Sequence, residues 1–249
     1  MTSKPLSYRN SHTAPRKGVA YDTGYASDPG SRLYWSLEQE ILADFLDTHF
    51  RGRQVRLLDF ACGTGRVTGF LEDRVSSAVG VDVSPSMLGV ARRKLRRTEL
   101  IQADLTQQNV LAGRRFDLIT AFRFFVNAEP ALRRQVMAIL APLLADDGYL
   151  VFNNHQNRTA PWSLYGQIRN RGECFRWRYN VMSMQEMRTL AAGAGLRVAE
   201  WFHLGLVAPR LVGLFPASWP PAIERVAMKL PFLAPLSEEV IAACRHARG

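Results

Sequence analysis

Short apolar runs alternate with segments of helical periodicity along residues 32–154. The apolar runs predict strands, and the segments with apolar residues at intervals of about 3.6 predict helices. The predicted strands are 55–60, 78–82, 100–103, 116–122 and 149–154. The predicted helices are 32–50, 65–74, 85–97 and 130–144. Strands that alternate with helices are typical of an α/β fold, so we predict a doubly wound, mostly parallel sheet flanked by helices.

The pattern is looser beyond residue 155. Ser183 followed by Glu186 has the spacing of a capping box, which predicts a helix over 183–193. The other predicted elements are helices at 161–170, 221–229 and 236–246, and strands at 174–182 and 196–204. The chain divides into a flexible N-terminal arm, a main domain, and a proline-rich lid or covering extension. Their predicted bounds are 1–30, 31–206 with an insert at about 156–182, and 207–249.

The composition is that of an ordinary globular protein, since 47% of the 249 residues are hydrophobic and 22% are charged. No apolar run reaches the roughly 18 residues that span a bilayer. The N-terminal segment lacks the apolar core of a secretory signal. Cys62, Cys174 and Cys244 have no metal-ligand spacing and make no even disulfide set, and Cys62 is interpreted as a packing residue. We therefore expect a cytoplasmic protein without a metal site.

The net charge of +10 leaves several classes of partner open. An excess of basic residues can promote binding to nucleic acid, to an acidic membrane surface or to an anionic small substrate. The charges are spread along the chain, so the excess can also have no role beyond keeping the protein soluble. Arg92, Arg93, Arg96 and Arg97 gather on one face of a predicted helix. We interpret them as a solvated face rather than an RNA-binding patch.

The stretch LLDFACGTGRVTGFL, residues 57–71, predicts a strand, a tight glycine turn and a helix. Such a turn commonly holds a nucleotide-like ligand at the helix N-terminus. A dinucleotide turn needs G-x-G-x-x-G, but Thr68 follows Gly63 and Gly65 where the third glycine should stand. The Lys-Ser/Thr pair of a P-loop is absent as well. Because neither phosphate-binding motif fits, the turn favours a nucleoside ligand without phosphate.

Asp59, Ala61, Gly63 and Gly65 follow the pattern acid-x-small-x-Gly-x-Gly. In this the stretch resembles the first motif of the class I S-adenosylmethionine-dependent methyltransferases, although alanine stands where that family most often has glycine. Four later stretches resemble further motifs of the family in order: VGVDVSPSMLGVARRK, QADL, FDLITAFRFFVN and LLADDGYLVFNN. The resemblance covers roughly residues 33–155. It implies a Rossmann-like fold whose ligand lies at the carboxyl ends of the strands.

The resemblance also implies which residues bind S-adenosylmethionine and its product S-adenosylhomocysteine. Asp82 would accept hydrogen bonds from the ribose hydroxyls, and Met87 would lie beside the adenine. Ala103 and Asp104 would flank the adenine edge. The full set of expected cofactor-binding residues is Asp59, Ala61, Gly63, Gly65, Asp82, Met87, Ala103 and Asp104, with Tyr21 and Tyr25 of the arm closing over the ligand.

Several of these residues also have a plainer interpretation. Asp59 can anchor the turn through hydrogen bonds to backbone amides without touching a ligand. Asp82 can cap the next helix, although Ser84 already serves that purpose. Met87 can be a core residue, and Asp104 can be an ordinary loop acid. The two tyrosines can belong to a disordered arm.

Residues that act on the methyl acceptor should follow the fourth and fifth strands. His155 comes directly after the fifth strand, and the ordinary pKa of histidine suits a general base. Arg123 and Asn127 follow the fourth strand. Arg123 could bind an anionic group bidentately, or brace Glu129 or Asp147. We predict His155 as the general base and Arg123 as the second acceptor-side residue.

These features predict a methyltransferase that acts on a small molecule, most often at oxygen, such as a secondary metabolite, a sugar or a lipid-linked precursor. The competing hypotheses are an RNA methyltransferase, a non-catalytic cofactor-binding module and a nicotinamide oxidoreductase. The Asp/Asn-Pro-Pro-Tyr/Phe motif for base nitrogens is absent, and AFRF stands in its place. Residues 175–179, FRWRY, could bind an anionic or carbohydrate acceptor or pack across strands. The proline-rich tail could pack on the domain, form a lid or touch lipid peripherally.

Overall fold

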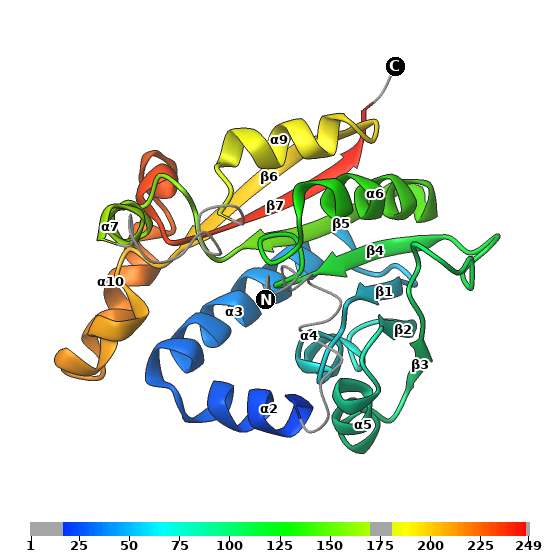
Figure 1. Cartoon of the computed structure of the whole chain (residues 1–249), viewed down its shortest axis with the longest axis horizontal. Helices are drawn as coiled ribbons and strands as arrows, with labels where there is room; N and C mark the ends of the chain where they lie inside the picture. The colour runs from blue at the N-terminus through cyan, green and yellow to red at the C-terminus, as the bar shows by residue number, and fades with distance from the viewer. Residues whose placement is uncertain (1–16, 170–180, 248–249) are drawn as a thin grey trace, which may run out of the picture.

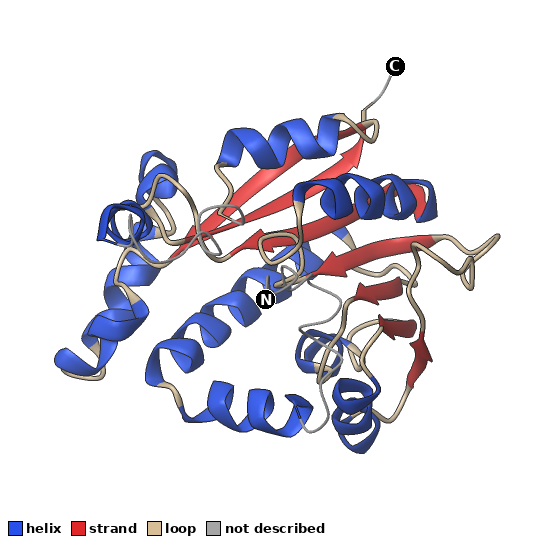
Figure 2. Cartoon of the chain, in the orientation of Figure 1, coloured by secondary structure: helices blue, strands red, loops and turns tan. Residues whose placement is uncertain are grey.

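A computed structural model describes residues 17–169 and 181–247, and a seven-stranded sheet forms its centre (Figures 1 and 2). The strands are β1 (Arg56–Phe60), β2 (Ser77–Asp82), β3 (Thr98–Gln102), β4 (Phe116–Ala121), β5 (Leu144–Asn154), β6 (Leu196–Leu204) and β7 (Glu239–His246). Their order across the sheet is β3-β2-β1-β4-β5-β7-β6. The five strands from β1 to β5 pair in parallel, and β7 is antiparallel to both β5 and β6. The predicted α/β fold with a mostly parallel sheet is therefore confirmed.

The helices alternate with the parallel strands, as the periodicity predicts. They are α2 (Lys17–Ser27), α3 (Pro29–His49), α4 (Arg66–Leu71), α5 (Pro85–Lys94), α6 (Pro130–Leu140), α7 (Pro161–Arg169), α9 (Met184–Ala192) and α10 (Trp219–Ala227), with short 3-10 helices η1 (Ala141–Leu143), η2 (Pro209–Leu214) and η3 (Pro231–Leu236). Ser84 caps α5, and Ser183 with Glu186 forms the predicted capping box of α9. The helix predicted over 130–144 ends at Leu140, because a proline interior to a helix cannot donate its backbone hydrogen bond.

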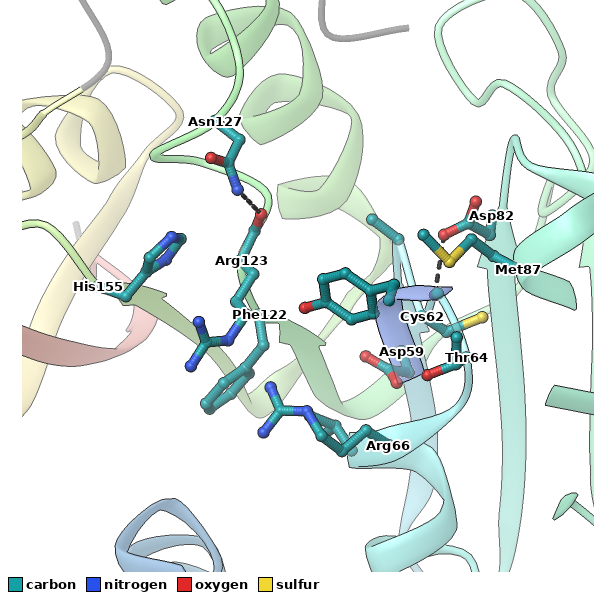
Figure 3. Close-up of a pocket in the computed structure, with 14 residues that line it drawn as sticks. Asp59, Cys62, Thr64, Arg66, Asp82, Met87, Phe122, Arg123, Asn127 and His155 are labelled. Atoms are coloured by element: carbon teal, nitrogen blue, oxygen red, sulfur yellow. Dashed lines mark hydrogen bonds between the residues drawn. The ribbon is translucent and has the colours of Figure 1, made fainter. Parts of the chain in front are cut away.

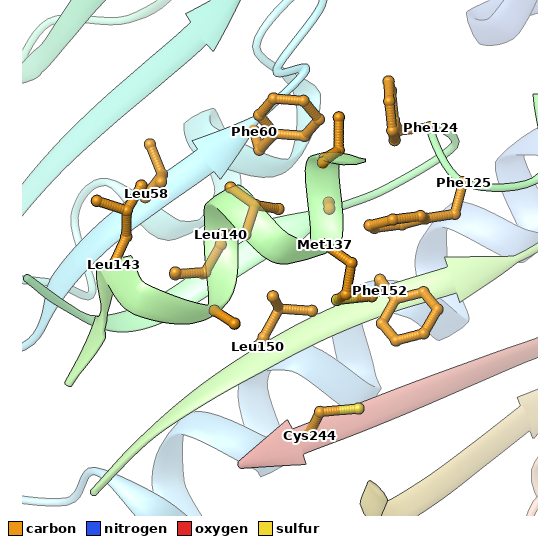
Figure 4. Close-up of a cluster of buried hydrophobic side chains, with 14 of the residues drawn as sticks. Leu58, Phe60, Phe124, Phe125, Met137, Leu140, Leu143, Leu150, Phe152 and Cys244 are labelled. Carbon is orange, nitrogen blue, oxygen red and sulfur yellow. The ribbon is translucent and has the colours of Figure 1, made fainter. Parts of the chain in front are cut away.

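Two apolar layers cover the two faces of the sheet. On one face, α6 packs Met137 and Leu140 close to Leu150 and Phe152 of β5 (Figure 4). The helix α9 lies against β6 and β7 on the same side and adds Met187 to this apolar cluster. On the other face, α3 packs Leu37, Ile41 and other apolar residues against β1 and β4. With both faces covered, the loops at the carboxyl ends of the strands remain available for a ligand.

The helix predicted over 236–246 is wrong, because these residues contain β7. Its residues from Val240 to Cys244 are fully buried between β5 and β6, so both faces of the strand are apolar. A strand of this kind shows no alternation of apolar and polar positions, and a short apolar run cannot be told from a helix by periodicity. The end of the predicted extension 207–249 thus completes the sheet instead of covering it.

Within the arm predicted over 1–30, the structure places α2 at 17–27 and the start of α3 at Pro29. The helix α2 lies against α5 (Figure 1). A Cβ on Gly18 would lie 2.3 Å from the backbone oxygen of Ser86, so glycine permits this close approach. Residues 1–16 and 170–180, including most of the strand predicted over 174–182, lie outside the described residues. No described helix has both the length and the apolarity that crossing a membrane requires.

Candidate active site

A cavity of about 340 Å³ opens at the carboxyl ends of β1, β2, β4 and β5 (Figure 3). This edge of an open α/β sheet is where ligands bind. The lining residues are Tyr21, Asp59, Ala61, Cys62, Gly63, Thr64, Arg66, Val67, Asp82, Met87, Phe122, Arg123, Asn127 and His155. The cavity thus brings together most of the predicted cofactor residues and both predicted acceptor-side residues.

Gly63 and Gly65, in the turn after β1, have different structural roles. Gly63 has φ 57°, and a Cβ added there would meet only the carbonyl oxygen of Ala61, at 3.9 Å. Gly63 therefore keeps the cavity floor open to a ligand. Gly65 has φ 76°, and a Cβ there would lie 2.9 Å from Cδ1 of Leu95. Gly65 therefore allows α4 to pack closely beside α5, and it does not line the cavity.

Ala61 adopts the left-handed conformation that favours glycine, with φ 55°. This conformation costs an L-residue about 1–2 kcal/mol, and the extra freedom of glycine in the unfolded chain offsets about 0.5–1 kcal/mol. We expect Ala61→Gly to raise the free energy of unfolding by roughly 0.5–1 kcal/mol in denaturant titration. Ala222→Gly, in the exposed middle of α10, should instead lower it by about 1 kcal/mol. A loss of stability in Ala61→Gly would show that Ala61 is not strained.

The Asp59 side chain holds the turn in place. Its carboxylate accepts hydrogen bonds from the backbone N–H of Thr68 at 3.2 Å and from the hydroxyls of Thr68 at 2.5 Å and Thr120 at 2.8 Å. Burial raises the pKa of Asp59 to about 6, and these hydrogen bonds act in the opposite direction. Asp59 lines the cavity, but its partners tie it to α4 and β4. The geometry favours the anchoring interpretation over direct ligand contact.

Asp82 lies at the end of β2 and faces the cavity (Figure 3). One carboxylate oxygen accepts from the N–H of Gly63 at 2.8 Å, and the other accepts from the N–H of Ser84 at 2.8 Å. Burial raises its pKa, and the backbone donors oppose that rise. Each carboxylate oxygen can accept more than one hydrogen bond, so acceptor capacity remains for a ligand. Met87 is buried beside it and also lines the cavity.

Ala103 and Asp104 lie next to the site without lining the cavity. The N–H of Ala103 donates to the backbone oxygen of Asp82 at 3.2 Å. The Asp104 carboxylate accepts from the N–H of Thr106 at 2.9 Å and from its hydroxyl at 2.6 Å. The structure therefore places Asp104 in a hydrogen-bonded turn, as its plainer interpretation expects, and its contact with the adenine stays a prediction.

The two arm tyrosines belong to α2 and stack on each other, with ring centroids 6.1 Å apart. Tyr21 lines the cavity. Tyr25 lies beside it, where its ring contacts the guanidinium groups of both Arg66 and Arg123, at 4.4 and 4.9 Å. The helix α2 thus forms a wall of the cavity, and the closing of Tyr21 and Tyr25 over a ligand stays a prediction.

The other side of the cavity holds Phe122, Arg123, Asn127 and His155 (Figure 3). Arg123 has φ 59°, a strained conformation held by a hydrogen bond from its N–H to Oδ1 of Asn153 at 2.6 Å. Its guanidinium donates to the Tyr25 hydroxyl at 2.9 Å. The Nε of Arg123 is buried and has no hydrogen-bond partner among the described residues.

His155 directly follows β5, and Nδ1 of its imidazole is also buried without a hydrogen-bond partner in the described part of the chain. Burial and the positive charges of Arg123 and Arg66 hold its pKa well below 6.5. The imidazole is therefore neutral at physiological pH and has a lone pair available. Buried polar atoms without partners are rare in native proteins and often mark functional positions.

Behind the acceptor side of the cavity lies a cluster of buried charged groups that was not predicted from the sequence. Glu38 of α3 pairs with Arg66 at 2.6 Å and lies 3.7 Å from the Arg123 guanidinium. Glu239 of β7 lies 3.9 Å from the same guanidinium. The side-chain amide of Asn153 donates to both carboxyl groups, to Glu38 at 3.4 Å and to Glu239 at 2.6 Å.

The two carboxyl groups differ in protonation. The pKa of Glu239 is raised to about 8, chiefly by burial and then by repulsion from Glu38. The pKa of Glu38 is lowered, because its attraction to Arg66 and Arg123 outweighs its burial. Glu239 therefore holds a proton more readily than Glu38, and Glu38 is the ionised partner of the two guanidinium groups.

Two interpretations from the sequence agree with the structure outside this cluster. Cys62 packs against the backbone of Gly80, and burial raises the pKa of its thiol well above its ordinary value, which suits a packing residue better than a nucleophile. Arg92, Arg93 and the two arginines that follow α5 are exposed and do not line the cavity.

Comparison with known proteins gives a family for the central part of the chain. Residues 57–148 match the family model described as a methyltransferase domain. The chain is 35% identical over 111 residues to a predicted methyltransferase of Geobacillus sp. (strain WCH70), a match that covers 42% of this chain and 44% of that protein. It is 28% identical over 152 residues to the trans-aconitate 2-methyltransferase of Paracidovorax citrulli, covering 59% of this chain and 55% of that protein. The chain thus spans about half the length of these relatives.

Solved structures share the fold over a larger part of the chain. A S-adenosylmethionine-dependent methyltransferase of Thermotoga maritima has a TM-score of 0.64 at 15% identity, covering 92% of this chain and 96% of that one. The magnesium protoporphyrin IX methyltransferase of Synechocystis, solved with bound S-adenosylhomocysteine, has a TM-score of 0.63 at 13% identity, covering 88% and 86%. Residues 57–148 therefore match a methyltransferase domain by sequence, and the described residues share the fold of solved S-adenosylmethionine-dependent methyltransferases.

Proposed function

We propose that this chain transfers the methyl group of S-adenosylmethionine to an anionic small molecule, at an oxygen atom. One observation carries the proposal. A single cavity has the open glycine turn and Asp82 on one side, and an unpartnered imidazole beside an arginine on the other. A cofactor half and an acceptor half in one cavity are what a transfer reaction requires, because the two reactants must be held together.

The cofactor half fits the nucleoside. The space above Gly63 lets a ligand approach the backbone, and the Asp82 carboxylate can accept hydrogen bonds from ribose hydroxyls. Met87 offers an apolar contact for a flat base. S-Adenosylmethionine supplies a methyl group that is already activated on a sulfonium, so the protein need only orient the acceptor and remove its proton.

The acceptor half suits a hydroxyl or carboxylic acid. Neutral His155 can take the acceptor's proton at Nδ1, which has no hydrogen-bond partner among residues 17–169 and 181–247. An imidazole with a lowered pKa is a weak base, so it works best on an acidic acceptor. The positive charges of Arg123 and Arg66 that lower the pKa of His155 also stabilise an acceptor anion, which makes its proton easier to remove.

The electrostatics of the cavity wall favour an acceptor with a negative charge. The guanidinium groups of Arg66 and Arg123 offer a counter-ion to a carboxylate or an acidic oxygen. The Nε of Arg123, which has no partner among the described residues, offers a donor. Two relatives are named for acceptors of this kind, trans-aconitate in Paracidovorax citrulli and a malonyl group in Acetivibrio thermocellus. Both names support a carboxylate-bearing acceptor.

Cofactor binding can be measured by calorimetric titration with S-adenosylmethionine, S-adenosylhomocysteine and NAD. We expect the first two ligands to bind and NAD not to bind. Asp82→Ala should weaken binding by about 1–3 kcal/mol, roughly 5- to 150-fold, because the ribose hydroxyls lose a buried acceptor. Asp73→Ala is the matched control, since Asp73 is largely exposed and makes only a 3.6 Å ion pair with Arg97.

The outcomes separate the competing functions. Equal affinity in Asp82→Ala would remove Asp82 from the site. Binding of S-adenosylmethionine without transfer of labelled methyl to any of a panel of carboxylic and phenolic acids would favour the non-catalytic module. Transfer to RNA, with steep salt dependence, would favour the RNA methyltransferase.

A further inference from the structure

Exposed apolar side chains gather at one end of the molecule. Of the fifteen large hydrophobic side chains that are exposed among the described residues, twelve lie between residues 164 and 236. This region contains α7, η2, α10 and η3, which lie together at the left of Figure 1. Scattered exposed hydrophobic residues are normal, but a gathering of this kind marks an interaction surface.

The outward face of α10 carries the centre of this surface. Trp219, Ile223 and Val226 are 57%, 39% and 63% exposed. With 3.6 residues per turn, their spacing of four and three residues places them in one stripe along the helix, within about 60° of one another. The very exposed Leu214 and Phe232, at 77% and 73%, lie in η2 and η3 on either side of α10 along the chain.

Two contacts fix the rotation of α10, so the helix cannot turn this stripe inward. On its inner side, the fully buried carboxylate of Glu224 accepts from the N–H groups of Gly205 at 2.8 Å and Val207 at 2.6 Å. At its flank, Arg225 pairs with Glu40 of α3 at 2.7 Å. Turning the stripe inward would leave a buried carboxylate and two backbone donors without partners.

The charges around the stripe suit an acidic surface. Glu224 is the only acid between residues 206 and 237, and it is buried. The exposed charged side chains described in this segment are basic, namely Lys229 and Arg225, of which Arg225 is paired with Glu40 of α3. The whole chain carries a net charge of +10. An apolar helix face that includes tryptophan and is flanked by basic residues is the pattern of a helix that lies in the interface of an anionic bilayer.

We propose that the apolar stripe of α10, with Leu214 and Phe232, docks peripherally onto a bilayer that contains anionic phospholipid. The docking elements are joined to the acceptor side of the cavity. The side-chain amide of Asn157, two residues after His155, donates to the backbone oxygens of Pro235 and Ser237, at 3.1 and 3.0 Å. A docked α10 and η3 therefore hold the acceptor side of the cavity near the bilayer.

Cosedimentation of the full chain with vesicles tests the proposal. We expect the protein to bind phosphatidylcholine vesicles that contain phosphatidylglycerol, and to bind pure phosphatidylcholine far more weakly. The double variant Ile223→Ser/Val226→Ser should lower the partition coefficient by about tenfold or more, and Lys229→Glu should lower it on the anionic vesicles. Val110→Ser is the matched control, because Val110 is 42% exposed and far from α10 along the chain.

The proposal fails if the wild-type chain does not bind the anionic vesicles, or if the double variant binds as well as Val110→Ser. Light scattering in the absence of lipid measures the molar mass of the protein, and so tests whether a second copy of the chain covers the stripe instead. A dimer that the double variant loses, without vesicle binding, would make the stripe an interface between two copies and overturn the proposal. Unchanged affinity for S-adenosylhomocysteine in every variant shows that the fold is intact, so this result stands apart from the test of the proposed function.

Discussion

Replacing His155 by alanine is expected to lower the rate of methyl transfer by roughly 10²–10⁴-fold, which is the usual contribution of a general base. The imidazole lines the acceptor side of the cavity, and its Nδ1 is buried without a hydrogen-bond partner in the described part of the chain. Affinity for S-adenosylhomocysteine should stay unchanged, because His155 and Asp82 lie on opposite sides of the cavity (Figure 3). Single-turnover transfer of labelled methyl and calorimetric titration measure the two quantities separately.

The pH dependence of the methyl-transfer rate also tests the role of His155, because a residue with only a structural role would not change it. Because burial and two arginines hold the pKa of His155 well below 6.5, the wild-type rate should be flat through neutral pH and fall only in more acidic solution. The residual rate of His155→Ala should lack that acidic fall. His246→Ala, at the far end of β7, is the control and should keep both the rate and the profile. A normal rate in His155→Ala would assign proton removal elsewhere.

The cofactor side of the site could be predicted from the sequence because its parts are local. A strand, a glycine turn and a helix follow one another in the chain, so Gly63 is placed by its immediate neighbours. Asp82 ends the neighbouring strand, and the parallel pairing of β1 with β2 brings it to the same edge of the sheet. Spacing along the chain and the pairing of two adjacent parallel strands fix both positions, which is why the structure gathers them in one cavity.

The buried charge cluster could not be predicted in the same way. Glu38, Asn153 and Glu239 come from α3, β5 and β7, and only the pairing of β5 with β7 brings the last two together. A helix over 236–246 would have separated them. The sequence does contain one signal, because Glu38 is four residues from both Tyr34 and Leu42, which are buried. An acid on the apolar face of a helix points inward and needs a buried partner.

Glu38→Ala should produce the largest loss of stability of any change discussed here. Glu38 is fully buried and pairs with Arg66, and it lies 3.7 Å from Arg123. Removing one partner of a buried ion pair typically costs 3–5 kcal/mol, because the remaining charge keeps its desolvation penalty. The melting temperature should fall by on the order of 10 °C. Glu38→Gln should also destabilise the protein, since it keeps the shape of the side chain and removes only the charge.

Glu40 provides a matched control two residues away on α3. Its ion pair with Arg225 has nearly the same length as the pair of Glu38, 2.7 Å against 2.6 Å, but both partners are partly exposed. Exposed pairs contribute about 0–1 kcal/mol, so Glu40→Ala should change the free energy of unfolding little. Equal effects of Glu38→Ala and Glu40→Ala in urea titration would contradict the role of burial. If Glu38→Ala alone is strongly destabilising, the cost comes from leaving the Arg66 guanidinium without its 2.6 Å carboxylate partner.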